Sequence, residues 1–190
     1  MNGIILHSSR YGATKRYADW LAEATGFDCA EVGAARVDSL RPYDTVVFGG
    51  GVYASSIAGL SFLKKHIDQL KGKKLVVFCD GASPYDEKAF RQIVEHNLKG
   101  ELAGLECFYC RGALDYERMS FVDRNLCKLL RRAVAKKKPE DREPLEQALM
   151  EAGFERRDWT DRASLEPILA ALRQRAALST LQTIPDPERS

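Results

Sequence analysis

Short apolar runs alternate with longer segments of helical period along the first 110 residues of this chain. The apolar runs, which are predicted strands, cover residues 3–7, 29–32, 45–48, 74–79 and 105–110. Helices are predicted between them, over residues 13–24, 59–70 and 85–98, where apolar residues recur every three or four positions. Such alternation predicts parallel strands joined by crossover helices. We therefore expect an α/β, doubly wound parallel sheet with helices on both faces.

The remaining 80 residues exceed the one helix that a five-stranded domain would still need. An apolar stripe of helical period ends at Pro139, and further helices are predicted over residues 144–152 and 163–178. We expect a single domain over residues 1–178 with a helical insertion at about residues 116–161, and a disordered tail at residues 179–190. The stripe is expected to pack in a core, and consists of Met119, Val122, Leu126, Leu129 and Ala133.

The net charge of +2 conceals a strongly basic segment. Residues 118–138 carry a net charge of +7, which leaves −5 for the rest of the chain. A basic face of this kind suits a membrane surface, nucleic acid or an acidic ligand, and it is equally typical of a solvated helix. Nucleic acid is not expected, because no aromatic residues or recognition motif accompany the basic residues.

Several features favour a cytoplasmic protein. No apolar run reaches the roughly 18 residues that a membrane-spanning helix needs, and the first residues do not resemble a cleavable signal peptide. The five cysteines are irregularly spaced, which fits a reducing compartment. Cys107 and Cys110 would point to opposite faces of a strand, so no metal site is expected.

The candidate site lies in the loops after the first, third and fourth strands, because ligands bind beyond the carboxyl ends of strands in an open parallel sheet. The first loop offers hydroxyls, backbone N–H groups and a helix N-terminus, which suit a phosphate. A simple helix N-cap would use similar residues. His7 borders this loop, whose members are Ser8, Ser9, Arg10, Tyr11, Gly12, Ala13 and Thr14.

The second and third loops each combine glycine with an aromatic residue. Glycine permits close backbone approach to a flat ligand, and tyrosine offers a stacking face. The second loop contributes Gly50, Gly51, Val52, Tyr53 and Ala54. The third contributes Asp80, Gly81, Ala82, Ser83 and Tyr85. With the first loop they predict a pocket for a planar heterocycle that ends in a phosphate.

Residues 9–14, Ser-Arg-Tyr-Gly-Ala-Thr, resemble the T/S-x-T-G-x-T phosphate loop of flavodoxins, with Tyr11 in place of the usual hydroxyl residue. Residues 8–14 are also similar to the S-T-R-D-G-Q-T loop of the menaquinone-dependent protoporphyrinogen IX dehydrogenases, flavodoxin-like enzymes of haem synthesis. That family carries a G-A-L-x-Y-x-R segment, an aromatic residue, D-R and a basic helix after its fifth strand. Here the corresponding residues are 112–118, Phe121, Asp123 and Arg124.

The resemblance implies a flavodoxin-like sheet with strand order 2-1-3-4-5, FMN as cofactor and oxidoreductase activity. A flavin enzyme needs position and electrostatics from its protein, so no catalytic residue is assigned. The resemblance further implies a porphyrinogen substrate and a quinone acceptor. Basic residues would meet the substrate propionates, or anionic lipid at the inner face of the membrane. These residues are Arg118, Arg124, Lys128, Arg131 and Arg132.

Three other functions compete with this hypothesis. A flavodoxin-type electron carrier would bind FMN without a small-molecule substrate, although such carriers are typically more acidic than this chain. A receiver-type signalling module would need acids after the first and third strands, where this chain has His7-Ser8 and Gly49-Gly50. A binding module without FMN is favoured by the bulk of Tyr11, which would crowd a phosphate.

Overall fold

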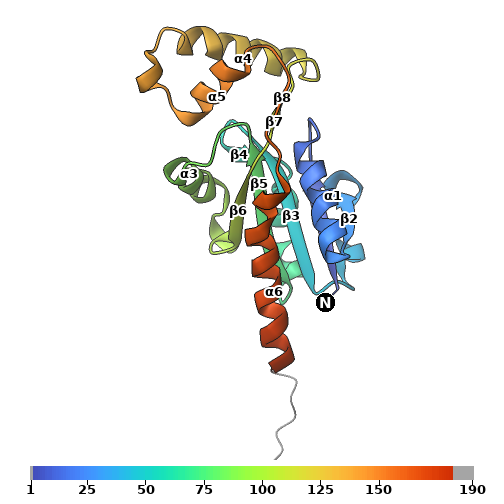
Figure 1. Ribbon diagram of the computed structural model, residues 1–190. Coiled ribbons are helices and arrows are strands. Elements are labelled where there is room, and N and C mark those ends of the chain that lie inside the picture. Colours follow the sequence, from blue (N-terminus) through green and yellow to red (C-terminus); the bar gives the residue numbers. More distant parts are fainter. Residues whose placement is uncertain (1, 182–190) are drawn as a thin grey trace, which may run out of the picture.

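The structure, a computed structural model, describes residues 2–181, and their side chains as far as residue 174. Figure 1 shows a central sheet with helices on both faces and a helical appendage beyond one end of the strands. Five parallel strands lie in the order β2-β1-β3-β5-β6, which is the 2-1-3-4-5 order expected for a flavodoxin-like fold. The predicted fold class is therefore confirmed. The strands are β1 (Gly3–Ser8), β2 (Asp28–Glu31), β3 (Thr45–Tyr53), β5 (Lys74–Gly81) and β6 (Glu106–Arg111).

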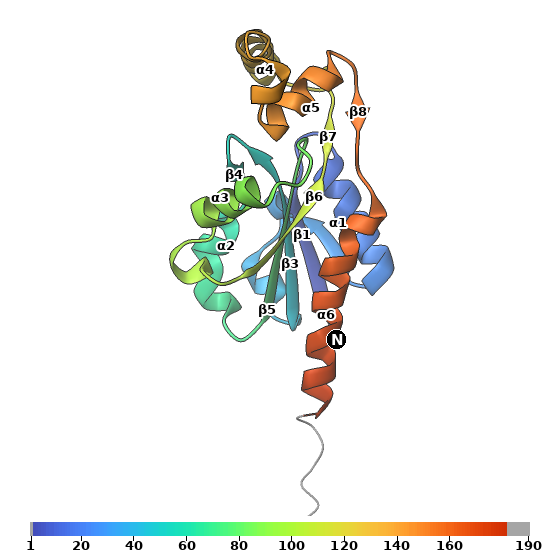
Figure 2. The same cartoon turned by 60° about the vertical axis from the view of Figure 1, so that its left-hand side comes forward.

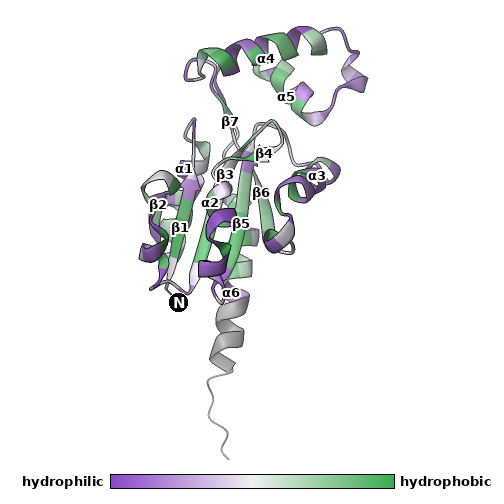
Figure 3. Ribbon diagram, turned by 180° about the vertical axis from the view of Figure 1, so that it is seen from behind, coloured by the Kyte–Doolittle hydropathy of each residue, from purple (hydrophilic) through white to green (hydrophobic). Residues whose placement is uncertain are grey.

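Two pairs of helices cover the sheet. Helices α1 (Ala13–Thr25) and α6 (Glu166–Leu181) lie on one face, and α2 (Ser61–His66) and α3 (Glu87–Asn97) lie on the other (Figures 1 and 3). Short 3-10 turns connect these elements or extend them. They are η1 (Val32–Ala34), η2 (Val37–Leu40), η3 (Ile67–Leu70), η4 (Gly100–Leu102), η5 (Pro139–Asp141) and η6 (Arg162–Leu165).

Each face of the sheet has its own apolar core, and Figure 3 shows the apolar residues concentrated in the strands. Under α1 and α6, Tyr17 and Ile168 pack against Phe78 with no exposed surface. On the opposite face, Leu63 packs against Phe48. Burial on both sides explains why residues 46–48 and 75–79 of the central strands are apolar at consecutive positions instead of at alternate ones.

Strand β3 is longer than the sequence predicts, because residues 49–53 continue it. It then turns back into β4 (Ser56–Ile57), which pairs with its last residues. The glycines that suggest a loop serve close packing inside the strand. A side chain at Gly49 would occupy the position of the Phe78 ring, and one at Gly50 would meet the carbonyl of Ala58.

The insertion rises from the sheet on a two-stranded antiparallel stem, β7 (Ala113–Leu114) with β8 (Arg157–Asp158) (Figure 2). It carries helices α4 (Phe121–Val134) and α5 (Pro144–Ala152). A small core of Tyr116, Met119 and Leu149 holds it together.

The apolar stripe of α4 is not a core, contrary to expectation. Val122, Leu126 and Leu129 are 72%, 60% and 64% exposed. The reason is that α4 packs against α5 with another face, which carries Cys127 and Val134. With Ala133, four of the five residues in the stripe are thus open to solvent.

The closing helix is α6, which begins at Glu166 after the turn η6 and runs to Leu181. Residues 179–181 of the expected tail therefore belong to this helix, and residues 182–190 lie outside the described residues. None of the helices within residues 2–181 is long and apolar enough to cross a membrane.

A candidate cofactor cleft beneath the helical insertion

A cavity of about 460 Å³, here called the cleft, opens at the carboxyl ends of the parallel strands. All three predicted loops contribute to its wall. The first loop supplies Ser9, Arg10, Tyr11, Ala13 and Thr14. The second supplies Gly51, Val52, Tyr53 and Ala54, and the third supplies Asp80, Gly81 and Ala82.

The insertion forms a fourth wall that the sequence does not predict. Its apolar lining includes Leu114, Met119, Leu126, Cys127 and Leu145. Leu126 and Leu145 are 60% and 48% exposed, and they border the cleft from two different helices. The sequence indicates this wall only through the apolar stripe, and the stripe alone does not show which surface it faces. Helices α4 and α5 therefore cover the cleft.

The first loop has the geometry of an anion cradle. Gly12 adopts φ +101°, a left-handed conformation that favours glycine, directly before α1 begins. Its N–H donates to Ser9 Oγ at 3.1 Å. The first turn of α1 contains no acidic residue, so the helix N-terminus keeps its favourable field for an anion.

Arg118 lies against this cradle. A side-chain carbon at residue 12 would be 3.6 Å from Arg118 Nη1, so the guanidinium is adjacent to Gly12. The structure thus separates Arg118 from the other basic residues that the sequence grouped with it. It brings a cation from the insertion to the predicted phosphate loop.

Tyr11 joins the first loop to the insertion. Its hydroxyl donates a short hydrogen bond to the Asp123 carboxylate, and it accepts one from the Ser120 N–H at 3.4 Å. Its ring meets Tyr53 edge-on, with 6.1 Å between centroids. The hydrogen bond from Tyr11 lowers the pKa of Asp123. Tyr11 is thus held between the second loop and α4.

Tyr53 also stacks with a cation. The Arg10 guanidinium lies 4.6 Å from the centre of the Tyr53 ring and 3.6 Å from the Asp123 carboxylate. Burial raises the pKa of Tyr53 to about 12, so its hydroxyl stays protonated at neutral pH. Arg10, Tyr53 and Asp123 form one wall from the first loop, the second loop and the insertion.

Asp80, near the end of β5, is a buried acid in the wall of the cleft. Its residue is 6% exposed, and its Oδ1 has no hydrogen-bond partner among the described residues. Burial raises the pKa of Asp80 to about 6, although a hydrogen bond from the Thr14 hydroxyl opposes the shift. The sequence predicts Asp80 as a site residue but not that it is buried.

The other predicted residues of the three loops lie outside the lining of the cleft. The Ser8 side chain approaches Gly59. The Ser83 carbonyl accepts a hydrogen bond from the Tyr109 hydroxyl at 2.7 Å, and Tyr85 is 61% exposed. Gly12 and Gly50 act through the backbone conformation and packing already described. His7 is buried, and burial lowers its pKa.

The four remaining basic residues line a separate cavity of about 710 Å³, here called the basic groove. Arg124 donates to the Glu117 and Met119 carbonyls, and Arg131 donates to the Leu149 carbonyl at 2.7 Å. These two arginines stabilise the insertion. Lys128 and Arg132 are exposed, and the apolar walls of the groove are Tyr116, Ala135, Met150 and Phe154.

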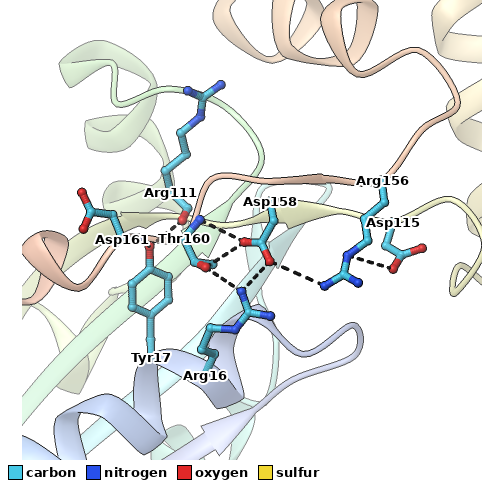
Figure 4. A network of polar contacts seen from close by, with 8 residues as sticks. All are labelled: Arg16, Tyr17, Arg111, Asp115, Arg156, Asp158, Thr160 and Asp161. Atoms are coloured by element: carbon cyan, nitrogen blue, oxygen red, sulfur yellow. Dashed lines mark hydrogen bonds and ion pairs between the residues drawn. The ribbon is translucent and has the colours of Figure 1, made fainter.

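Polar contacts between α1 and the stem fix the insertion over the cleft (Figure 4). The Tyr17 hydroxyl donates to the Arg111 carbonyl at 2.6 Å and accepts from the Asp161 N–H at 3.0 Å. Arg16 pairs with Asp158 and donates to Thr160. Both segments that connect the insertion to the sheet are therefore held by Arg16 and Tyr17, neighbouring residues of α1.

No group of three or more metal-ligating side chains occurs among the described residues. The predicted separation of Cys107 and Cys110 is observed, since they pack in the cores on opposite faces of the sheet.

Comparisons with known proteins point to one family. A family described as flavodoxin domain matches residues 4–142, while no curated protein matches. Among solved structures, a flavodoxin, WrbA-like protein from Agrobacterium tumefaciens is 16% identical, with 79% of this chain and 91% of that chain covered and a TM-score of 0.44. Megasphaera elsdenii flavodoxin is 19% identical over 56% of this chain and 82% of its own, with a TM-score of 0.43. An NADH:FMN oxidoreductase in apo form is 18% identical over 58% and 75%, with a TM-score of 0.42. On the match over residues 4–142, the chain belongs to the flavodoxin-domain family.

Proposed function

We propose that this protein is an FMN-dependent oxidoreductase. The observation that carries the proposal is the cleft. An anion cradle, an aromatic wall and glycines meet there, at the carboxyl ends of the parallel strands. Its position is where open α/β sheets bind ligands. Membership of the flavodoxin-domain family supports FMN as the ligand.

The residues present fit FMN. Ser9, the backbone around Gly12 and the Arg118 guanidinium would hold the phosphate, since they supply a hydroxyl, N–H groups and a positive charge in one place. Tyr53 offers an aromatic face, and Gly51 and Gly81 permit close backbone approach. When bound, FMN supplies the redox chemistry by accepting and passing on electrons. The apolar residues of the insertion would exclude water from the cleft.

We further propose that the substrate is a porphyrinogen, protoporphyrinogen IX, and that a quinone is the acceptor. The resemblance of residues 8–14 and 112–124 to the protoporphyrinogen IX dehydrogenases supports this substrate. Lys128 and Arg132, exposed in the basic groove, would attract its anionic propionates.

A membrane quinone would be reached through α4, which is proposed to rest on anionic lipid. Its exposed apolar residues Phe121, Val122 and Leu129 would enter the lipid interface, and the flanking lysines and arginines would meet the headgroups. Each basic residue near such a surface contributes about 1 kcal/mol.

The first test is a titration of the purified protein with FMN, followed by visible absorption and flavin fluorescence. Saturable one-to-one binding is expected, and its absence from the folded protein would contradict the proposal. The loaded protein is then mixed without oxygen with protoporphyrinogen IX and a soluble quinone, and the fluorescence of the porphyrin product is recorded. FMN binding without turnover would favour an electron carrier.

A charge reversal tests the basic groove. Lys128→Glu with Arg132→Glu is expected to raise KM for the porphyrinogen at least severalfold with FMN affinity unchanged, because these residues line the groove and not the cleft. Lys64→Glu with Lys65→Glu on α2 changes the net charge equally and serves as the control. An equal loss in both double variants would contradict a role for the groove.

A further inference from the structure

The buried acid Asp80 has little to balance its charge. It lies near the end of β5, between Gly51 of β3 and Cys110 of β6, and faces the cleft. A side-chain carbon at Gly112 would be 2.8 Å from its Oδ2, so only glycine there leaves room for the carboxyl group. Its Oδ1 is buried without a partner.

The titratable groups that surround Asp80 do not supply a counter-charge. They come from α1, β3, β5 and β6, and all have raised pKa values, chiefly through burial or, for Cys79, through its hydrogen bond with Cys107. They are therefore neutral at pH 7. These groups are Tyr17, Tyr53, Cys79, Tyr109 and Cys110.

Two nearby cations are engaged elsewhere, and a third, Arg118, lies against Gly12 in the cradle. Arg10 pairs with Asp123 and stacks on Tyr53. Arg111 donates to the Ala82 carbonyl and stacks on Trp159. No ion pair includes Asp80 among the residues that the structure describes.

Asp80 and the anion cradle share one cleft. Ser9 of the first loop, Thr14 in the first turn of α1 and Asp80 all line it. An ionised Asp80 would therefore repel an anion in the cradle. A protonated Asp80 removes the repulsion and itself becomes a donor.

We propose that Asp80 links FMN binding to a proton: as the phosphate group enters the cradle, the Asp80 carboxylate takes up one proton from solvent. This inference rests on the proposed function. It identifies Asp80 as a positioning residue that sets the pH dependence of cofactor affinity. Since one proton is involved, the affinity for FMN changes by at most about tenfold per pH unit and is highest at low pH.

The test compares the wild-type protein with Asp80→Asn, which keeps the shape of the side chain without its charge. FMN dissociation constants are measured by flavin fluorescence at pH 5.5, 6.5, 7.5 and 8.5. As the pH rises, the affinity of the wild-type protein for FMN is expected to fall severalfold or more relative to the affinity of the variant. The phosphate of FMN also titrates near pH 6, by analogy with a phosphorylated side chain, but this contribution is common to both proteins. Riboflavin, which lacks the phosphate, is the matched ligand and is expected to show a smaller difference.

Calorimetry on the wild-type protein gives a second measurement that does not depend on the variant. FMN is titrated at pH 7 in buffers of different ionisation enthalpy, and net proton uptake that is larger for FMN than for riboflavin is expected. FMN binding with equal proton uptake for both ligands, or with the same pH profile in Asp80→Asn, would overturn this inference alone. No FMN binding by the folded protein at any pH would overturn the proposed function, and the inference with it.

Discussion

Tyr11 has a structural role that its position in a phosphate loop does not suggest. Its hydroxyl and ring connect the first loop to Asp123, Ser120 and Tyr53, which belong to the insertion and the second loop. One side chain therefore links the cradle to the helices above it. A smaller hydroxyl residue at position 11 would not reach that far.

Tyr11→Phe tests this link. The variant is expected to lose about 1–3 kcal/mol of stabilisation, because the hydrogen bond has a charged acceptor. Amide hydrogen exchange of residues 120–123 should accelerate while exchange in the sheet stays unchanged. Tyr43→Phe removes another tyrosine–aspartate bond, to Asp28 in the body of the domain, and is the control. Unchanged exchange at residues 120–123 would contradict the link.

The burial of Asp80 predicts that the stability of the cofactor-free protein depends on pH. Burial raises its pKa from 3.8 to about 6, so the folded state binds a proton that the unfolded state has released at intermediate pH. The stabilisation is complete below pH 4 and is lost as the pH rises through 6. Asp80→Asn should therefore stabilise the protein at pH 8 by up to about 3 kcal/mol relative to its effect at pH 4. Urea unfolding at the two pH values measures the difference, and the same substitution at the exposed Asp44 is the control.

At the scale of the element, α4 has three distinct faces. One face, with Cys127 and Val134, packs within the insertion, and a second carries Lys128 and Arg132 in the basic groove. The third face is the exposed apolar stripe. A helix with an exposed apolar face and a basic flank is typical of binding in the plane of a membrane interface.

Val122→Ser with Leu129→Ser tests the exposed face. Because both side chains are already in water, the stability should change by less than about 0.5 kcal/mol each. Binding to vesicles that contain anionic lipid should fall severalfold in a sedimentation assay. Tyr85→Ser removes an exposed aromatic residue far from α4 in sequence and should leave vesicle binding unchanged. A large loss of stability in the double variant would instead place the stripe in a core.

The strands and helices of the body are predictable from sequence because each has a single periodic pattern. The predictions that are wrong concern segments whose structure depends on contacts with residues distant in sequence. Residues 49–53 contain three glycines and read as a loop, yet Phe78 and the β4 hairpin make them a strand. The stripe of α4 has the period of a core helix, and only the position of α5 shows that most of the stripe stays exposed.

At the scale of the whole molecule, charge is separated between the two parts. The segment at residues 118–138 carries +7, and the rest of the chain carries −5. Helix α4 of the basic segment lies beyond the sheet (Figure 2), and its residue Leu126 lines the cleft. This polarity would orient the molecule in front of an anionic surface before contact.

Salt should weaken that association, because screening shortens the range of the field. Binding to vesicles with anionic lipid is expected to fall severalfold between 50 and 300 mM NaCl, and neutral vesicles should bind weakly at both concentrations. Binding that does not respond to salt would mean that the apolar face alone is responsible. Co-sedimentation at each salt concentration makes the measurement.

The sequence predicts the cleft only in part, for reasons that also lie at this scale. The three loops are predictable because carboxyl ends of parallel strands share an edge. The contribution of Arg118 and Leu126 is not, because it depends on how the stem directs the insertion. Basic residues of one segment thus lie in different sites, with Arg118 at the cradle and Lys128 in the basic groove.

The stem has an evolutionary consequence. The backbone N–H of Trp159 donates to the Gly112 carbonyl at 3.1 Å, so the chain leaves the sheet and returns to it at the same point. A segment with adjacent ends can be gained, lengthened or lost in one genetic event without altering the register of any parallel strand. The cover of the cleft is thus free to diversify among descendants of this sheet while the strands and the cradle beneath it stay as they are.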